Sequence, residues 1–349
     1  MEYRAFGRTG VKVSAMCLGC MNFGGRAGEA DSIAIIHRAL DAGINFVDTA
    51  NVYGHDPANF DVGRGRSEEI VGKALQQNGR RDRIVLATKA HFPMGDDVNE
   101  RGSSRRHLIS QCEASLRRLR TDHIDLYQLH SPSLDTPIDE TLRALDDLIR
   151  SGKVRYIGSS TFAAWQLVES LWVAKEYGLN RFISEQPAYN LLDRRIEREL
   201  VPMAQTYGIA ILPWSPTAGG FLTGKYRRGE PIPAESRFGA FWRRFALNHF
   251  TDAAFDVLDA ITQLSADKGC TPGQLALAWC AAQPGITSPI IGPRTLEQLE
   301  DNLGALNVQL SDADRERIDA AAPPGRVTVA YYGYDGLAWE PWGPHRYRW

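Results

Sequence analysis

Residues 44–53 read INFVDTANVY, and this stretch decides the fold of the 349-residue chain. An apolar run follows Gly43, a pattern that is typical of a short buried β-strand after a turn. The run ends at Asp48, and Tyr53 follows five residues later. A carboxylate at the end of a buried strand costs free energy unless a cation or hydrogen-bond donors face it. The rest of the chain must therefore supply partners for Asp48.

The same pattern, an apolar strand that ends in polar or small groups, recurs along the chain. Polar ends gathered on one side of parallel strands are what an α/β barrel with its site at the C-terminal face requires. We therefore predict an α/β fold, a (β/α)8 TIM barrel, with a first strand at residues 15–19 and an N-terminal β-hairpin at residues 3–14 that caps the bottom. The other predicted strands are 84–89 (IVLATK), 124–130 (IDLYQLH), 154–160 (VRYIGSS), 182–186 (FISEQ), 209–215 (IAILPWS) and 288–292 (SPIIG).

Apolar residues at helical spacing separate these strands, as a barrel needs. The first helix, at residues 31–42, has Asp31 as its expected N-cap. A chain of this length is compatible with one barrel, so we expect a single domain over residues 1–349. The further predicted helices are 67–75, 105–119, 136–151, 163–177, 195–207, 253–268, 272–283 and a helix that begins near residue 295.

Three irregular segments interrupt the regular alternation of strands and helices. Residues 54–66 and 216–248 follow predicted strands and are too long to be simple connections, so we expect binding loops on the C-terminal face. Residues 323–349 form a tail rich in Tyr and Trp without a helical or strand period. Such a tail either packs on the barrel or lines a substrate pocket.

Composition excludes several classes of function. The net charge of −2 gives no electrostatic reason to expect nucleic acid or an anionic membrane as partner. No apolar run has spanning length, and the N-terminus does not resemble a secretory signal, so we expect a cytoplasmic protein. Cys17 and Cys20 form a C-x-x-C pair that could be redox-active or half of a metal site. Because no second pair follows, we expect buried reduced thiols and no metal.

Asp48, Tyr53, Lys89 and His130 come from three successive strand ends, so a barrel would bring them together. An ammonium near Tyr53 favours phenolate and lowers the pKa of the phenol, which makes it a better acid at neutral pH. Asp48 would hold Lys89 charged, and His130 would orient a substrate oxygen or relay the proton. This set predicts a catalytic site for acid–base chemistry. A lysine at a barrel strand end could also form a Schiff base, as in class I aldolases, and this alternative stays open.

Along essentially its whole length the chain resembles the aldo-keto reductase family, in particular its aryl-alcohol-dehydrogenase-like and channel β-subunit-like branch. In that family the matching positions form a catalytic tetrad, which implies Asp48, Tyr53, Lys89 and His130, with Tyr53 as general acid–base. The resemblance implies hydride transfer from a nicotinamide bound without a Rossmann fold. The segments that carry it are YRAFGRTGVKVSAMCLGCMNFG, INFVDTANVYG, IVLATK, IDLYQLH, ISEQPAYNLLDR, ILPWSPTAGGFLTGKY and IIGPRTLEQLEDN.

The resemblance also implies the cofactor contacts. Ser160 and Gln186 would hold the carboxamide of the nicotinamide, and Trp214 would stack on its ring. Two positions depart from the family pattern, because Thr161 follows Ser160 where asparagine is usual and Cys20 stands where threonine is common. At the pyrophosphate the resemblance implies Ser215, Leu222, Lys225 and Arg237, and at the adenosine it implies Arg294, Gln298 and Asn302. Further implied cofactor contacts are Gly19, Met21, Asp48 and Gly292.

NADP(H) is the expected cofactor. Arg294 directly precedes the helix that begins near residue 295, and an arginine beside a helix N-terminus suits a 2′-phosphate. Gly292 takes a place where some relatives carry a lysine, so the preference would depend largely on Arg294. The expected partner is a small carbonyl or alcohol substrate of aromatic or hydrophobic character, and a homo-oligomer is left open. Because channel β-subunits share the resemblance, a cofactor-binding regulatory role remains the second alternative.

Overall fold

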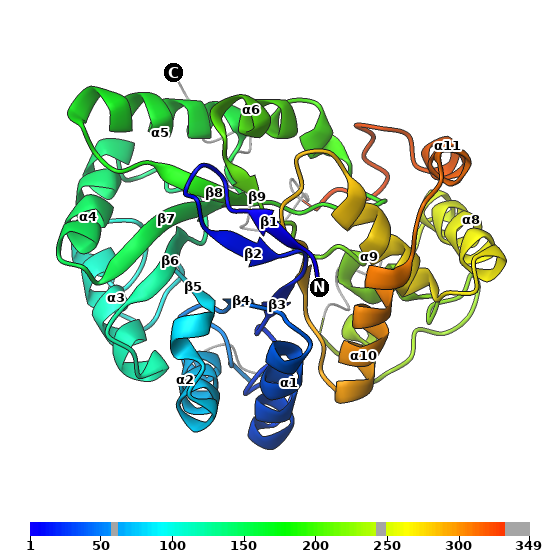
Figure 1. Ribbon diagram of the computed structural model, residues 1–349, viewed down its shortest axis with the longest axis horizontal. Helices are drawn as coiled ribbons and strands as arrows, with labels where there is room; N and C mark the ends of the chain where they lie inside the picture. Colours follow the sequence, from blue (N-terminus) through cyan, green and yellow to red (C-terminus); the bar gives the residue numbers. More distant parts are fainter. Residues whose placement is uncertain (57–61, 242–248, 332–349) are drawn as a thin grey trace.

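The structure is a computed structural model, and it describes residues 1–56, 62–241 and 249–331. Parallel strands curl into a sheet of eight, with the order β10-β3-β4-β5-β6-β7-β8-β9, and helices surround it (Figure 1). Backbone hydrogen bonds from Thr287 to Ile211 (2.9 Å) and from Ile290 to Pro213 (2.8 Å) join the two edges and close the barrel. The predicted (β/α)8 fold is confirmed. The strands are β3 (Cys17–Gly19), β4 (Phe46–Asp48), β5 (Val85–Ala90), β6 (Ile124–Leu129), β7 (Val154–Ser160), β8 (Phe182–Gln186), β9 (Ala210–Ile211) and β10 (Ile290–Ile291).

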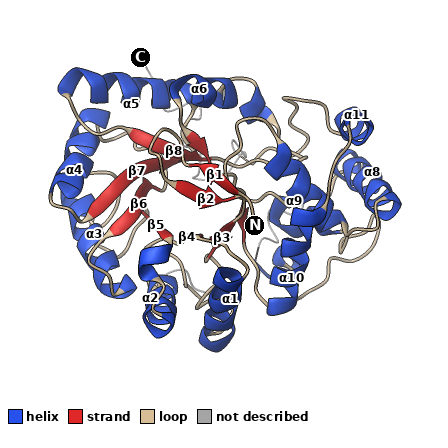
Figure 2. Ribbon diagram, viewed as in Figure 1, coloured by secondary structure: helices blue, strands red, loops and turns tan. Residues whose placement is uncertain are grey.

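Most helices lie where their apolar period predicts them, on the outside of the sheet (Figure 2). In the part of the chain that the structure describes, no helix combines the length and apolarity needed to cross a membrane. The helices are α1 (Glu29–Asp41), α2 (Arg66–Asn78), α3 (Arg105–Leu119), α4 (Ile138–Arg150), α5 (Ala164–Tyr177), α6 (Leu200–Tyr207), α8 (Asp252–Asp267), α9 (Pro272–Ala282), α10 (Leu296–Gly304) and α11 (Asp312–Ala321).

Two local predictions about these helices were wrong, and one helix was missed. Helix α1 is capped by Gly28, so Asp31 lies in its first turn, where a carboxylate still favours the helix dipole. Residues 195–207 do not form one helix, because α6 starts at Leu200 and thereby places Pro202 in the first turn, where its missing N–H costs nothing. Helix α11 was not predicted, although Ser311 begins a capping box there.

The N-terminal hairpin closes the bottom of the barrel, as predicted. Strand β1 (Tyr3–Ala5) pairs antiparallel with β2 (Lys12–Ser14). The turn between them buries Phe6, whose ring meets that of Phe46 at 5.4 Å between centroids. Cys17 belongs to the same interior cluster, and all five cysteines are free thiols.

A β-bulge in β8 positions one residue of the site. The register passes from Ile157 opposite Phe182 to Ser159 opposite Glu185, so three steps on β8 match two on β7. Side chains alternate along a regular strand, so without the extra residue Gln186 would share the outward direction of Phe182. With the bulge, Glu185 faces outward and accepts from Ser159 Oγ at 2.5 Å. Gln186 therefore turns into the barrel.

Replacing Phe6 tests whether the N-terminal hairpin stabilises the barrel. Phe6→Ala removes a fully buried ring and should lower the free energy of unfolding by about 3–5 kcal/mol. Val98→Ala, at an exposed position, should change it by less than ~0.5 kcal/mol. Urea unfolding measures both. A loss for Phe6→Ala as small as that of the control would mean that the hairpin only covers the barrel without stabilising it.

Candidate active site

The four predicted catalytic residues meet at the C-terminal end of the barrel. Asp48 ends β4, Lys89 lies near the end of β5, His130 directly follows β6, and Tyr53 lies in the turn after β4. Lys89 Nζ donates to Asp48 Oδ2 at 2.5 Å and lies 3.5 Å from the hydroxyl of Tyr53. The same hydroxyl lies 3.2 Å from Nε2 of His130. Tyr53 thus stands between an ammonium group and an imidazole.

Asp48 has the partners that its position requires. Besides Lys89, its carboxylate accepts hydrogen bonds from Nε2 of Gln128 at 2.9 Å and from Nε2 of Gln186 at 3.0 Å. Lys89 donates a further bond to the carbonyl of Thr49 at 2.9 Å. Gln128 was not predicted, because an amide inside the run IDLYQL carries no signal of its own in the sequence. It contributes by holding the carboxylate in place.

Burial and charge set the protonation states of Lys89 and Tyr53. Burial lowers the pKa of Lys89, but Asp48 and Tyr53 outweigh it and raise the pKa above its ordinary value. The predicted net lowering of the Tyr53 pKa was wrong. Desolvation by burial raises the pKa of Tyr53 by more than Lys89 lowers it, so the net shift is upward. At neutral pH the ammonium is charged and the phenol keeps the proton that it can donate.

His130 is neutral at physiological pH. Burial, followed by repulsion from Lys89 and His91, holds its pKa well below the ordinary value. Phe92 packs its ring edge against the imidazole, with centroids 4.7 Å apart. A neutral imidazole cannot supply a proton as an imidazolium, so His130 is suited to orient an oxygen by a hydrogen bond.

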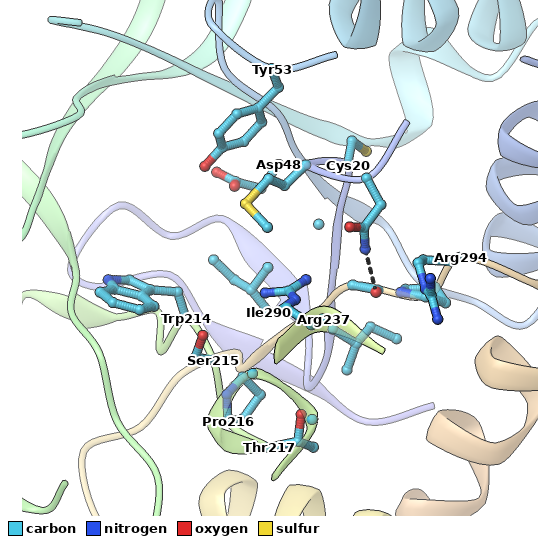
Figure 3. A pocket seen from close by; sticks show the side chains of 18 of the residues that line it. Cys20, Asp48, Tyr53, Trp214, Ser215, Pro216, Thr217, Arg237, Ile290 and Arg294 are labelled. Carbon is cyan, nitrogen blue, oxygen red and sulfur yellow. Dashed lines mark hydrogen bonds between the residues drawn. The ribbon is translucent and has the colours of Figure 1, made fainter. Parts of the chain in front are cut away.

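A cavity of ≈ 1020 Å³ opens beside the tetrad (Figure 3). Asp48, Tyr53 and His130 line it, whereas Lys89 lies buried behind them. Leu222 also does not line it, since the structure places this side chain in the hydrophobic core. The other residues that the sequence predicted for a cofactor all line the cavity, namely Gly19, Met21, Ser160, Gln186, Trp214, Ser215, Lys225, Arg237, Gly292, Arg294, Gln298 and Asn302.

Five cationic side chains line the cavity, and four of them influence one another electrostatically. The four are Arg26, Lys225, Arg237 and Arg294, and the fifth is Arg64. Burial, followed by repulsion within this group, lowers the pKa of Lys225 to about 8 and that of Arg237 to about 10. Among the described residues, Arg26, Lys225 and Arg294 form no ion pair with a carboxylate. Arg26 was missed, because a single arginine in the loop GGRAG gives no sequence signal. Clustered cations of this kind suit anionic groups such as phosphates.

Aromatic and strained residues shape the rest of the cavity. Trp214 meets Tyr331 edge-on at 5.5 Å between ring centroids, and both line the cavity. Tyr331 is the last described residue, and the tail predicted to cover the barrel lies mostly outside the described residues. Thr161 has a φ of 63°, which a β-branched residue rarely adopts and asparagine tolerates. The departure from the family pattern at this position therefore carries backbone strain.

The fold and the site together define an α/β barrel protein with a tyrosine held between a lysine and a histidine, beside a cavity lined by cationic side chains. Residues 15–323 match the model of the aldo/keto reductase family, and the chain belongs to this family. The resemblance predicted from the sequence is thereby confirmed.

Individual relatives span both enzymes and channel subunits. The chain is 40% identical over 340 residues to "Uncharacterized oxidoreductase YrpG" of Bacillus subtilis. This match covers 96% of this chain and 100% of the relative. It is 37% identical to a "Probable voltage-gated potassium channel subunit beta" of Oryza sativa, and this match covers 88% of this chain and 92% of the relative. It is 34% identical to versiconal hemiacetal acetate reductase of Aspergillus parasiticus, and this match covers 94% of this chain and 98% of the relative.

Lys89→Met tests the electrostatic assignment. The ammonium opposes the effect of burial on Tyr53, so its removal should raise the pKa of Tyr53 further. With Tyr53 as the expected proton donor in carbonyl reduction, the alkaline limb of the pH–rate profile should move to higher pH. We expect kcat at neutral pH to fall by at least ~10²-fold, because the phenol becomes a weaker acid. The half-exposed Lys153, changed to Met, serves as control and should shift neither quantity. An unmoved alkaline limb in Lys89→Met would make Lys89 structural.

Proposed function

We propose that this chain is an oxidoreductase that reduces an aldehyde or ketone, or oxidises the corresponding alcohol, with NADP(H) and Tyr53 as general acid–base. The observation that carries the proposal is the position of Tyr53, 3.5 Å from Lys89 Nζ and 3.2 Å from His130 Nε2, on the wall of a cavity that five cationic side chains also line. Membership of the aldo/keto reductase family supports the general class of reaction.

The residues of the tetrad have separate tasks in this proposal. A substrate carbonyl oxygen lies between Tyr53 and His130, where the neutral imidazole orients it. The hydride for the carbonyl carbon would come from a nicotinamide held by Ser160, Gln186 and Trp214. Tyr53 donates its proton to the oxygen as negative charge develops there, and the Lys89 ammonium stabilises the resulting phenolate. Asp48 keeps Lys89 charged and fixed.

The donor set around the cavity fits a nicotinamide dinucleotide with an added phosphate. Trp214 offers an aromatic face beside Tyr53, and Ser160 and Gln186 offer polar groups for the carboxamide. Figure 3 places Trp214 and Tyr53 on one side of the pocket and Arg294 on the other. A dinucleotide that spans the cavity would bring its phosphates to the cations. Their number supports NADP(H) over NAD(H), because NADP(H) carries one more phosphate.

The Schiff-base alternative fits this geometry less well. A lysine that attacks a carbonyl must be neutral, which enzymes achieve by lowering its pKa. Here Asp48 and Tyr53 raise the pKa of Lys89, and three oxygen atoms surround its ammonium group. Lys89 is therefore better suited to act as a fixed charge than as a nucleophile.

The wall around the tetrad supports a hydrophobic or aromatic substrate. Val52, Phe92, Pro93, Trp214 and Tyr331 line the cavity. Aromatic and apolar walls of this kind bind ligands mainly by burial of apolar surface. We also propose a single barrel domain over residues 1–349 and a cytosolic location, which the free thiols support.

Tyr53→Phe removes the phenolic hydroxyl and with it the acidic proton, and keeps the ring. We expect kcat for aldehyde reduction to fall by at least ~10²-fold, while the Kd for NADPH, measured by fluorescence quenching, stays near that of wild type. Tyr207→Phe on α6 should leave both unchanged. Activity of Tyr53→Phe within a few-fold of wild type would end the assignment. Tight NADPH binding by a wild type that reduces no aldehyde would favour the regulatory role instead.

Arg294→Ala tests the choice of cofactor. We expect wild type to prefer NADPH, and the ratio of kcat/KM for NADPH over NADH to fall by about 10-fold or more in the variant, since a charge-assisted bond to phosphate is lost. Lys225→Ala should instead lower kcat/KM for both cofactors alike, if it meets the pyrophosphate that they share. A wild type that prefers NADH would contradict the proposal. An unchanged ratio in Arg294→Ala would move the discrimination to another cation, such as Arg26.

A further inference from the structure

Glu185 on β8 is a buried carboxyl group to which the proposed reaction gives no task. It is fully buried and faces away from the barrel interior, whereas its neighbour Gln186 faces into it. Burial raises the pKa of Glu185 to about 8, and hydrogen bonds from Ser159, Phe162 and Thr161 oppose this shift. Among the described residues no cationic side chain forms an ion pair with it. Because a buried carboxyl group costs free energy, its hydrogen bonds must offset that cost.

The hydrogen bonds of Glu185 hold the end of β7 and the start of its connection to α5, residues 159–162, which we call the β7 turn. Oε2 accepts from Ser159 Oγ at 2.5 Å, and Oε1 accepts from the backbone N–H of Phe162 at 3.0 Å. A carboxyl oxygen can accept the N–H of Phe162 whether the group is charged or protonated, so this contact does not depend on pH. Phe162 is buried, and its ring packs edge-on to that of Phe182 at 5.8 Å between centroids. Glu185 therefore fixes the β7 turn from the outside of the barrel.

The next residue of β8, Gln186, holds the same turn through its backbone. Its carbonyl oxygen accepts from Ser160 Oγ at 2.9 Å and from the N–H of Thr161 at 3.2 Å. Ser160 and Thr161 both line the cavity. Because the hydroxyl of Ser160 donates its proton to Gln186, it offers only lone pairs to a ligand. Ser160 thus suits an N–H donor, such as the carboxamide of a nicotinamide.

Thr161 has a backbone conformation that needs to be held. Its φ of 63° lies in the left-handed region, which is unfavourable for a β-branched residue. Such a conformation persists only where the surrounding structure fixes it. The contacts from Glu185 and Gln186 lie on either side of Thr161 in the sequence and fix it in this way. If they weakened, the turn would relax toward an unstrained conformation and Ser160 would leave its position at the cavity.

We propose that Glu185 is a positioning residue, whose carboxyl group holds the strained β7 turn and thereby keeps Ser160 in place for the nicotinamide cofactor. That the ligand is a nicotinamide cofactor rests on the proposed function, whereas the hold on the turn does not. The bulge in β8 then has two effects, since it directs Glu185 to the turn and Gln186 into the barrel.

Glu185→Met removes both acceptor oxygens and keeps most of the side-chain volume. Without cofactor, we expect hydrogen exchange of the Phe162 N–H to become about 10-fold faster, because this buried donor loses its acceptor. The Kd for NADPH, measured by fluorescence quenching, should rise by about 10-fold, since less of the protein holds the binding conformation. Glu185→Gln keeps one acceptor oxygen and should stay within about 3-fold of wild type in both measurements. Glu68→Met is the control: it replaces an equally buried carboxyl group, beside Thr88 of β5, and should change neither quantity.

Thr161→Gly distinguishes a hold on the turn from a general loss of stability. Glycine adopts a positive φ without steric cost and adds no side-chain contact. In the double variant Glu185→Met/Thr161→Gly the turn should therefore stay in place without the carboxyl group. Exchange of the Phe162 N–H and the Kd for NADPH should both return to within about 3-fold of wild type. If Glu185→Met does not fold, Glu185→Leu, which also lacks an acceptor, takes its place.

Three results would overturn the proposal. They are a Phe162 N–H whose exchange does not respond to Glu185→Met, a double variant that recovers neither quantity, and faster exchange with an unchanged Kd for NADPH. A wild type that binds no NADPH would contradict the proposed cofactor instead, and the exchange measurements would still decide whether Glu185 holds the turn.

Discussion

The buried ion pair between Lys89 and Asp48 is the interaction on which the rest of the site depends. Neither charge is stable inside the barrel alone, and breaking such a pair leaves an uncompensated buried charge that costs about 3–5 kcal/mol. The register of the sheet places Asp48 opposite Ala87, two residues before Lys89, and places Lys89 opposite Gln128. The inward side chains of neighbouring strands thereby form one layer at the top of the barrel. The bulge in β8 adds Gln186 to this layer.

The sequence predicts this arrangement well where a residue type is unusual for its position. A charged residue at the end of an apolar strand is unusual, so Asp48 and Lys89 are visible in the sequence alone. Gln128 is a polar residue among apolar ones, and nothing local shows that it faces the same interior. Gln186 was predicted through family resemblance, but the bulge that turns it inward depends on the pairing of β7 with β8. Such pairing appears only in the folded structure.

The sequence predicted the direction in which each neighbouring charge shifts a pKa. It did not predict the net shift, in which burial opposes the charge. Lys89 does lower the pKa of Tyr53, as the sequence predicted, but the opposing effect depends on how deeply the hydroxyl is buried. The burial of this hydroxyl depends on the packing of the whole barrel, including the ring of Phe92 beside His130. Similarly, Arg294 was predicted as a cation near the adenosine. That Arg26 reaches the same cavity depends on the path of the loop between β3 and α1, which the sequence alone does not show.

Transfer of deuterium from labelled NADPH to the product tests most directly the claim that the chain reduces a carbonyl by hydride transfer. NADPH that carries deuterium at both C4 positions is incubated with the purified chain and an aromatic aldehyde, and the product is analysed by mass spectrometry and NMR. The account predicts an alcohol with one deuterium on the former carbonyl carbon and a solvent-derived proton on the oxygen. An alcohol without deuterium, or no alcohol together with a borohydride-trapped adduct on Lys89, would contradict it.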